Sequence, residues 1–183
     1  MDTISCILER RSIRKYKSEP VKDQDLAQVL EAIRWAPSWA NVQPWEVVVI
    51  RDRDVKQKLA DTLPKGNPAK NAILTAPVVI AMCGRWNKSG IYKDKMVTSL
   101  EDWMLFDLGI ACQNLCLAAR ALNMGTVHAG YLDHKAASAV LGLPEDVTVV
   151  ELVPLGYPDH SPGAPKRREI KEFVSYDKFG KHD

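Results

Sequence analysis

Residues 100–123 read LEDWMLFDLGIACQNLCLAARALN, and this stretch decides the fold. Its apolar side chains fall on nearly every side of a helix: Trp103, Met104, Phe106, Ile110, Leu115, Leu117 and Leu122. A helix that is apolar all round is buried on most of its surface. We therefore predict a central core helix that also forms a subunit interface and ends at Asn123-Met124-Gly125.

The flanking segments mix helical and strand patterns without a regular strand–helix–strand repeat. Leu26, Val29, Leu30 and Ile33 follow the spacing of one buried helix face. Short apolar and β-branched runs predict buried strands. We expect helices at 2–9, 23–36, 53–62 and 133–141, with 53–62 exposed, and strands at 46–50, 78–82, 126–131 and 147–155. This order favours an α+β fold with helices packed on a central sheet.

Length and composition limit the class of protein. The chain has 183 residues and a net charge of +2, which fits a single domain, 1–183, and is too small a basic excess for a nucleic-acid binder. No apolar run reaches the ~18 residues that cross a bilayer. The first residues lack a signal core, so we expect a cytoplasmic protein with no membrane partner. We expect 85–98 to be an exposed loop or lid.

Common catalytic and metal-binding motifs are absent. The sequence contains no GxGxxG, GxxxxGK[ST], HExxH or GxSxG motif. No CxxC pair occurs, and we interpret Cys112 and Cys116 as two small buried apolar residues. His128 and His134 are separated by six positions without a third ligand nearby in the sequence, so we predict no metal site.

Two basic clusters lie near opposite ends of the chain. Arg10, Arg11 and Arg14 accompany Ser12, and the second cluster is Lys166, Arg167 and Arg168. Arginine offers a fork of donors that matches phosphate oxygens, so the clusters are candidates to meet around one phosphate group. They fit equally well as two solvated basic faces, and their spacing alone does not decide.

A polar loop stands between Pro37 and Pro44. It contains Ser38, Asn41 and Gln43, followed by Trp45 at the start of a strand. Amide side chains donate and accept hydrogen bonds together, which suits the edge of a heterocycle such as a flavin pyrimidine ring. The alternative is a turn-rich connection with no ligand.

These segments together resemble the nitroreductase family of FMN flavoproteins. The resemblance lies in Arg10-Arg11-Ser12-Ile13-Arg14, in Ala36-Pro37-Ser38-x-x-Asn41-x-Gln43-Pro44-Trp45, and in Gly156-Tyr157-Pro158 followed by Lys166-x-Arg168-x-x-x-Glu172-x-Val174. Asp107-x-Gly109-x-Ala111-x-Gln113-Asn114-Leu115 with Gly125-Thr126 is similar to the family's central helix and following strand. The similarity covers nearly the whole chain.

The resemblance implies a homodimer with two FMN sites at the subunit interface and a mostly antiparallel central sheet flanked by helices. Within that site, the FMN phosphate is expected at Arg10, Ser12, Lys166 and Arg168, with Arg11 nearby. Arg14 is expected near the N1 and O2 edge, where it would stabilise the negative charge of the reduced flavin. Pro37, Ser38, Asn41 and Gln43 are expected on the ring, the first three of them from the partner subunit. Backbone groups around Ala129 and Gly130 are expected to face N5 and O4. The tail, about 159–183, is expected to extend and dock on the partner.

The activity implied is transfer of hydride from NADH or NADPH through FMN to a small organic acceptor, such as a nitroaromatic or quinone, in a ping-pong cycle. No side-chain catalyst is expected, because the flavin itself accepts and gives the hydride. A second hypothesis keeps the fold but changes the chemistry to dehalogenation, substrate oxidation or consumption of the flavin. A third is a non-catalytic module that binds a phosphorylated ligand or nucleic acid through the basic clusters.

Overall fold

The computed structural model describes residues 1–181, and its core is a four-stranded sheet. The strand order is β1 (Trp45–Ile50), β2 (Val78–Arg85), β6 (Val147–Gly156) and β5 (Gly125–Thr126), and each neighbouring pair is antiparallel. The α+β class and the mostly antiparallel sheet predicted from the sequence are confirmed. The strand expected at 126–131 is much shorter, because after Thr126 only Ala129 pairs again, in a separate bridge to Leu152.

Both faces of the sheet are buried. Along β2, Val78, Ile80 and Met82 point into one core, and the alternate residues of the strand belong to the other. This follows from the two-residue period of a strand, which sends successive side chains to opposite faces. Glu151 of β6 pairs with Met82, and the register shifts after this pair, so that Cys83 pairs with Val149.

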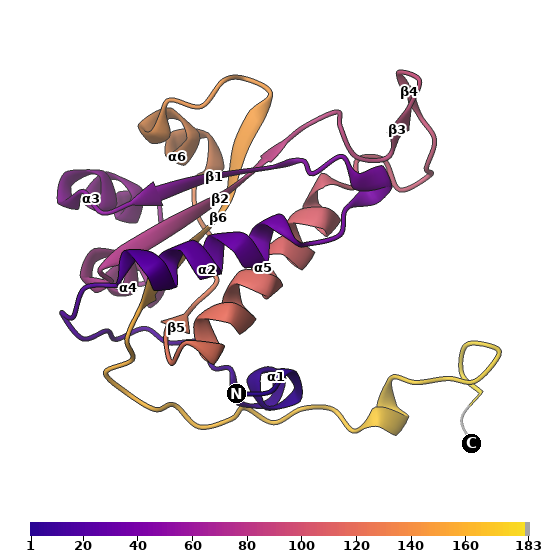
Figure 1. Cartoon of the computed structure of the whole chain (residues 1–183). Coiled ribbons are helices and arrows are strands. Elements are labelled where there is room, and N and C mark those ends of the chain that lie inside the picture. The colour runs from indigo at the N-terminus through magenta and orange to yellow at the C-terminus, as the bar shows by residue number, and fades with distance from the viewer. Residues whose placement is uncertain (182–183) are drawn as a thin grey trace.

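Helices cover the two faces in separate layers (Figure 1). One face carries α2 (Asp23–Arg34) and α5 (Met104–Ala121), which lie side by side. The other core contains buried residues of α3 (Arg53–Asp61), α4 (Ala69–Thr75) and α6 (His134–Leu141). The short α1 (Thr3–Glu9) packs against α5. The long helix predicted from residues 100–123 is thus the central helix of its layer.

Several local predictions need correction. Helix α3 is not an exposed helix, because Leu59 and Ala60 are fully buried and pack in the second core. Helix α4 was not expected from the sequence. The stretch 85–98 contains a small hairpin of β3 (Ile91–Tyr92) and β4 (Lys95–Met96). Its two-residue turn has positive φ at both positions, the geometry that hairpins favour.

The C-terminal segment leaves the body of the molecule. In Figure 1 it runs past α1 and away from the sheet, with one short 3₁₀ turn at Ile170–Glu172. Ile170, Phe173 and Phe179 are exposed along it.

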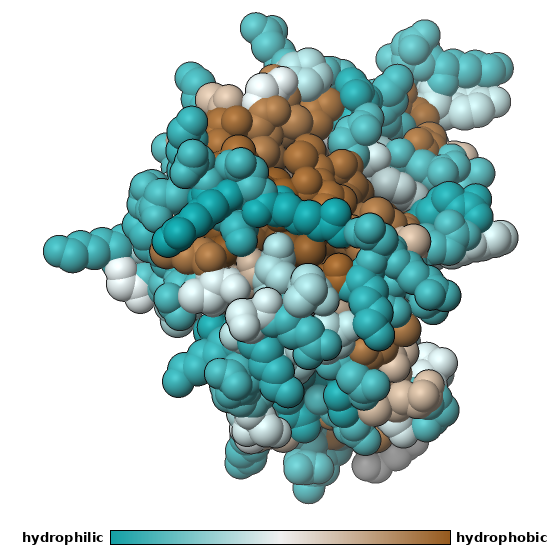
Figure 2. All heavy atoms as spheres, turned by 60° about the vertical axis from the view of Figure 1, so that its left-hand side comes forward, coloured by the Kyte–Doolittle hydropathy of each residue, from teal (hydrophilic) through white to brown (hydrophobic). Residues whose placement is uncertain are grey.

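Figure 2 shows a separate hydrophobic area on one face of the body, framed by hydrophilic side chains. Within residues 1–181 no helix combines the length and hydropathy needed to cross a bilayer.

Candidate functional site

The arginine-rich segment that follows α1 is held along the edge of the sheet. The Ile13 N–H donates to the Thr126 carbonyl at 2.9 Å, and Ser12 forms a parallel bridge with Thr126. The Tyr16 hydroxyl lies 2.7 Å from the Ile13 carbonyl oxygen. These contacts order residues 10–14 beside β5, so their side chains project from a fixed backbone.

Four of the predicted residues line one cavity with a distant part of the chain. This cavity of about 320 Å³ is lined by Arg10, Arg11, Ser12, Arg14, Pro162, Gly163, Pro165 and Arg167. The two segments approach because the Asp159 N–H donates to the Lys15 carbonyl at 3.0 Å. The Nη1 atom of Arg10 is buried and has no hydrogen-bond partner within residues 1–181. A buried, unpaired guanidinium N–H is costly, so its position favours an anionic group in the cavity.

The C-terminal basic cluster reaches this cavity through Arg167, whereas Lys166 and Arg168 are not among its lining residues. Arg168 instead lies over the Phe173 ring, 5.6 Å from its centroid, and donates to the Glu172 carbonyl. The segment has no regular secondary structure at these positions, and neighbouring side chains of an extended chain point in different directions. Residue spacing alone therefore does not select the cation that faces the cavity.

A second cavity, of about 520 Å³, adjoins Arg10 and Arg11 and was not expected from the sequence. Arg120 and His160 also line it, and the Nε atom of Arg120 and the Nδ1 atom of His160 are buried without a partner in the described chain. Arg120 does pair through Nη2 with Glu9 at 2.6 Å. The sequence places Arg120 in the last turn of α5. A basic residue there is also explained by its favourable interaction with the helix dipole, so the position by itself does not indicate a cavity.

The polar loop after α2 is exposed and has a strained backbone. Ala40, Asn41 and Gln43 have positive φ angles of 45°, 56° and 48°, which non-glycine residues seldom adopt. The Gln43 N–H donates to the Ser38 hydroxyl at 2.9 Å, and the Gln43 amide nitrogen lies 3.3 Å from Asn41 Oδ1. Pro37, Asn41 and Gln43 are all exposed. Such strain is typical of loops that bind ligands.

Helix α5 holds this loop and the arginine cluster apart. The Trp39 N–H donates to Asp107 Oδ1 at 3.0 Å, near the first turn of α5. The arginine segment lies at the other end, where Glu9 pairs with Arg120. The 13 residues between Asp107 and Arg120 correspond to roughly 20 Å along a helix. One chain therefore does not bring the predicted loop and phosphate residues into one site.

The turn after β5 contains the two residues, Ala129 and Gly130, whose backbone groups are expected to face a flavin. Ala129 uses both its N–H and its carbonyl in hydrogen bonds to Leu152, at 3.0 and 3.1 Å. Gly130 is exposed, and its N–H donates to no group in the described part of the chain. Of the two residues expected to face a flavin, only Gly130 has a main-chain N–H that is free to donate to a ligand. The N–H and the carbonyl of Ala129 are both hydrogen-bonded to Leu152 of β6.

The family model of the nitroreductase family matches residues 7–157. The chain belongs to this family. It is 32% identical over 187 residues to the FMN reductase [NAD(P)H] of Bacillus subtilis, covering 96% of this chain and 73% of that protein.

Two solved structures extend the similarity to the fold. An Exiguobacterium sibiricum protein in complex with FMN has a TM-score of 0.84 and 25% identity, covering 96% of this chain and 97% of that one. The NADPH:FMN oxidoreductase of Vibrio harveyi, complexed with NAD⁺, has a TM-score of 0.83 and 26% identity, covering 99% of this chain and 79% of that one. The nitroreductase fold predicted from the sequence is thereby confirmed.

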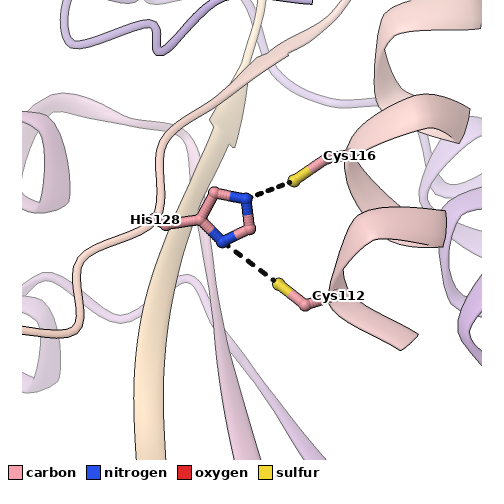
Figure 3. A group of neighbouring side chains, drawn as sticks. All are labelled: Cys112, Cys116 and His128. Carbon is pink, nitrogen blue, oxygen red and sulfur yellow. Dashed lines mark hydrogen bonds between the residues drawn. The ribbon is translucent and has the colours of Figure 1, made fainter. Parts of the chain in front are cut away.

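The chain also carries a polar cluster that we did not predict from its sequence. Cys112 and Cys116 of α5 face His128, with sulfur-to-nitrogen distances of 3.6 Å to Nδ1 and 3.5 Å to Nε2 (Figure 3). The expectation that no third ligand lies near His128 is wrong, because helix packing brings the two thiols to it. The signal available was the i, i+4 spacing of the cysteines, which places both on one helix face.

Hydrogen bonds within this cluster shift the pKa values of its three side chains. The contact between the two sulfurs raises the pKa of the Cys112 thiol and lowers the pKa of the Cys116 thiol. The Cys116 sulfur and then the Glu151 carboxylate, 2.9 Å from Nδ1, raise the pKa of His128 to about 10. A thiolate beside an imidazolium is the charge distribution that these contacts favour.

Proposed function

We propose that this chain is an FMN-dependent oxidoreductase that passes hydride from NADH or NADPH to a small organic acceptor, working as a homodimer. The observation that carries the proposal is the cavity shared by residues 10–14 and 162–167, whose lining includes Arg10 with an Nη1 atom that is buried and unpaired within residues 1–181. The FMN-bound and NAD⁺-bound structures of similar proteins support the same assignment.

The donors around this cavity fit a phosphate group. Arg10, Arg11 and Arg14 supply guanidinium groups, and Ser12 supplies a hydroxyl, all from one ordered segment. Charge-assisted hydrogen bonds of this kind are stronger than neutral ones. In this proposal Arg10 and Ser12 bind the FMN phosphate. The second end of the chain contributes through Lys166 and Arg168, as the family resemblance implies, or through Arg167, which lines the cavity here.

The residues around the flavin ring have a supporting role in hydride transfer. Bound FMN supplies the redox chemistry, accepting hydride and passing it on. Arg14 is exposed next to the cavity, and a fixed positive charge there would stabilise negative charge at the pyrimidine edge. The free N–H of Gly130 would donate to the other side of the ring. Neither residue has to exchange a proton with the substrate.

Two copies of the chain are needed to complete this site. The loop with Pro37, Ser38, Asn41 and Gln43 sits at the opposite end of α5 from the arginines, so the proposed ring contacts of this loop come from the partner. A symmetric dimer then forms two equivalent sites. Exposed apolar residues on α5, Leu105 and Phe106, and on the tail, Ile170, Phe173 and Phe179, supply surface for that interface.

In this proposal the acceptor is a nitroaromatic or quinone. The competing hypothesis is that the same fold carries out dehalogenation, substrate oxidation or consumption of the flavin. The test is the visible spectrum of the purified protein, followed by anaerobic addition of NADH or NADPH. We expect a yellow protein whose flavin bleaches and then recovers with a quinone or nitroaromatic. A colourless protein that takes up no FMN contradicts the assignment of FMN as the cofactor. Bleaching without recovery, together with turnover of a halogenated aromatic, favours the competing chemistry.

The phosphate assignment has its own test in three alanine variants. Arg10→Ala should lower FMN affinity by about 10- to 100-fold, because a charge-assisted bond is worth roughly 1.5–3 kcal/mol. Arg167→Ala and Arg168→Ala should separate the two candidate arginines of the tail, and Lys171→Ala is the matched control for lost charge. Flavin content per chain after dialysis is the measurement. Full occupancy in both arginine variants of the tail would show that neither arginine binds the phosphate.

A further inference from the structure

The cluster of Cys112, Cys116 and His128 has the composition of a metal site that the proposed oxidoreductase activity does not use. The two cysteines are 0% and 1% exposed, and they lie one helical turn apart on the side of α5 that faces the sheet. One ligand atom from each of the three residues lies within 4.8 Å of the others. The side chains converge from two elements, α5 and the turn after β5 (Figure 3).

The observed separations are close to those of ligands around one tetrahedral ion. Metal–sulfur and metal–nitrogen bonds of about 2.3 and 2.05 Å at a tetrahedral angle put the two donor atoms about 3.6 Å apart. Cys116 Sγ lies 3.5 Å from His128 Nε2, close to this value, whereas Cys112 Sγ contacts the other ring nitrogen, Nδ1, at 3.6 Å. Binding through Nε2 requires the imidazole and the Cys112 side chain to reorient until Nε2 faces both sulfurs.

Glu151 supplies the support that a metal-binding histidine usually has. Its Oε2 lies 2.9 Å from His128 Nδ1, which leaves Nε2 as the ligand atom. A carboxylate behind the ring fixes the tautomer and orients the imidazole. The antiparallel register of β2 and β6 pairs Glu151 with Met82, whose side chain belongs to the core against α5, so the carboxylate lies on the helix side of the sheet.

The site is also reachable from solvent. The His128 side chain is 39% exposed, and Cys116 lines the cavity of about 520 Å³. Three protein ligands with an open fourth position are typical of zinc sites that hold a water or another small ligand. Thiolate and imidazole donors select a thiophilic ion over magnesium or calcium, which prefer oxygen.

We propose that Cys112, Cys116 and His128 bind one Zn²⁺ per chain, with Glu151 positioning the histidine. The proposal does not depend on the flavin assignment, since none of these side chains is used in it.

Cobalt is the spectroscopic probe for this site. The full chain is isolated with its flavin, kept reduced, stripped of metal with a chelator and titrated with Co²⁺. We expect tetrahedral cobalt–thiolate bands in the red, beyond the absorption of oxidised flavin, that saturate at one equivalent and disappear when Zn²⁺ is added. Zinc affinity is then measured by competition with a chromophoric chelator.

Matched cysteine variants identify the ligands. Cys112→Ser, Cys116→Ser and His128→Asn should each weaken zinc binding by at least about 10-fold, and Glu151→Gln by roughly 10- to 100-fold. Cys6→Ser and Cys83→Ser, which change buried cysteines outside the cluster, should leave it unchanged. Circular dichroism without metal checks that each variant is folded.

Two results would overturn the proposal. One is a wild-type protein without red bands at stoichiometric Co²⁺ and with no more zinc retained than the folded Cys112→Ser/Cys116→Ser double variant. The other is a saturable band that persists in that double variant, which would place the ion elsewhere. Either result leaves the flavin test above unaffected, because FMN content is measured separately in the same samples.

Discussion

Asp107 is the buried carboxylate that ties the polar loop to the central helix, and its removal should have a measurable cost. It is 1% exposed, its Oδ1 accepts from the Trp39 N–H at 3.0 Å, and its Oδ2 accepts from the Ser89 hydroxyl at 2.5 Å. Asp107→Ala leaves both donors without this partner, the Ser89 hydroxyl in a fully buried position and the Trp39 N–H in a half-buried one. Each unsatisfied buried donor costs about 1–3 kcal/mol, so we expect a loss of about 3 kcal/mol.

The conservative variant separates hydrogen bonding from charge. Asp107→Asn keeps one acceptor for the Trp39 N–H, and the Ser89 hydroxyl can turn to accept from the new amide, so we expect a loss of only about 1 kcal/mol. Asp61→Ala, which removes an exposed ion pair with Lys70, is the control and should change stability by less than about 1 kcal/mol.

Equilibrium urea unfolding at fixed protein and flavin concentration is the measurement, because both shift apparent stability. A loss of 3 kcal/mol corresponds to a fall of about 6–12 °C in Tm for a chain of this size. The alanine variant should also retain less FMN than the asparagine variant, since the loop loses its anchor. An alanine variant within 0.5 kcal/mol of wild type would refute the reasoning.

Three further predictions concern the scaffold around the site. Gly125→Ala should cost about 1–3 kcal/mol in urea unfolding, because the added Cβ would lie 2.5 Å from Ile13 Cγ1 and 2.7 Å from its Cβ, which cannot move without the backbone. Tyr16→Phe should cost about 1–2 kcal/mol, since the hydroxyl lies 2.7 Å from the Ile13 carbonyl oxygen and 3.1 Å from that of Pro154; an unchanged unfolding midpoint would count against it. Burial raises the pKa of the Cys83 thiol from 9.0 to about 12, so above about pH 9 the unfolded chain releases a proton that the folded chain keeps. Wild type should therefore lose stability with rising pH more steeply than Cys83→Ala, by up to about 1.4 kcal/mol per unit, and equal slopes would contradict this.

The elements predicted correctly are those whose signals are local. Helix α6 begins after Asp133, whose side chain accepts from the Ala136 N–H at 2.9 Å, and ends at Gly142 with a φ of 65°. Both signals are legible in a few residues, because caps act on the adjacent turn. Strand β6 was similarly evident from its run of β-branched residues.

The elements predicted poorly depend on distant contacts. Helix α4 follows Pro68 and holds only seven residues, so its stability comes from burying Ala72 and Ile73 against the rest of the fold. Strand β5 has only two paired residues, because β6 offers no further partner until Leu152 meets Ala129. The local sequence indicates neither the burial that stabilises α4 nor the early end of β5.

The sequence by itself determined the family, the antiparallel α+β core and the set of arginines, serine and amides that the flavin proposal uses. The α+β class follows from residue type and hydrophobic pattern, which act locally, whereas the antiparallel sheet and the flavin residues follow from the resemblance of four short motifs to the family. Only the tertiary structure decided that Arg167 faces the cavity, that Ala129 has no free backbone group, and that two buried thiols meet a histidine. These are matters of side-chain direction and of contacts between segments far apart in the chain, which packing alone settles.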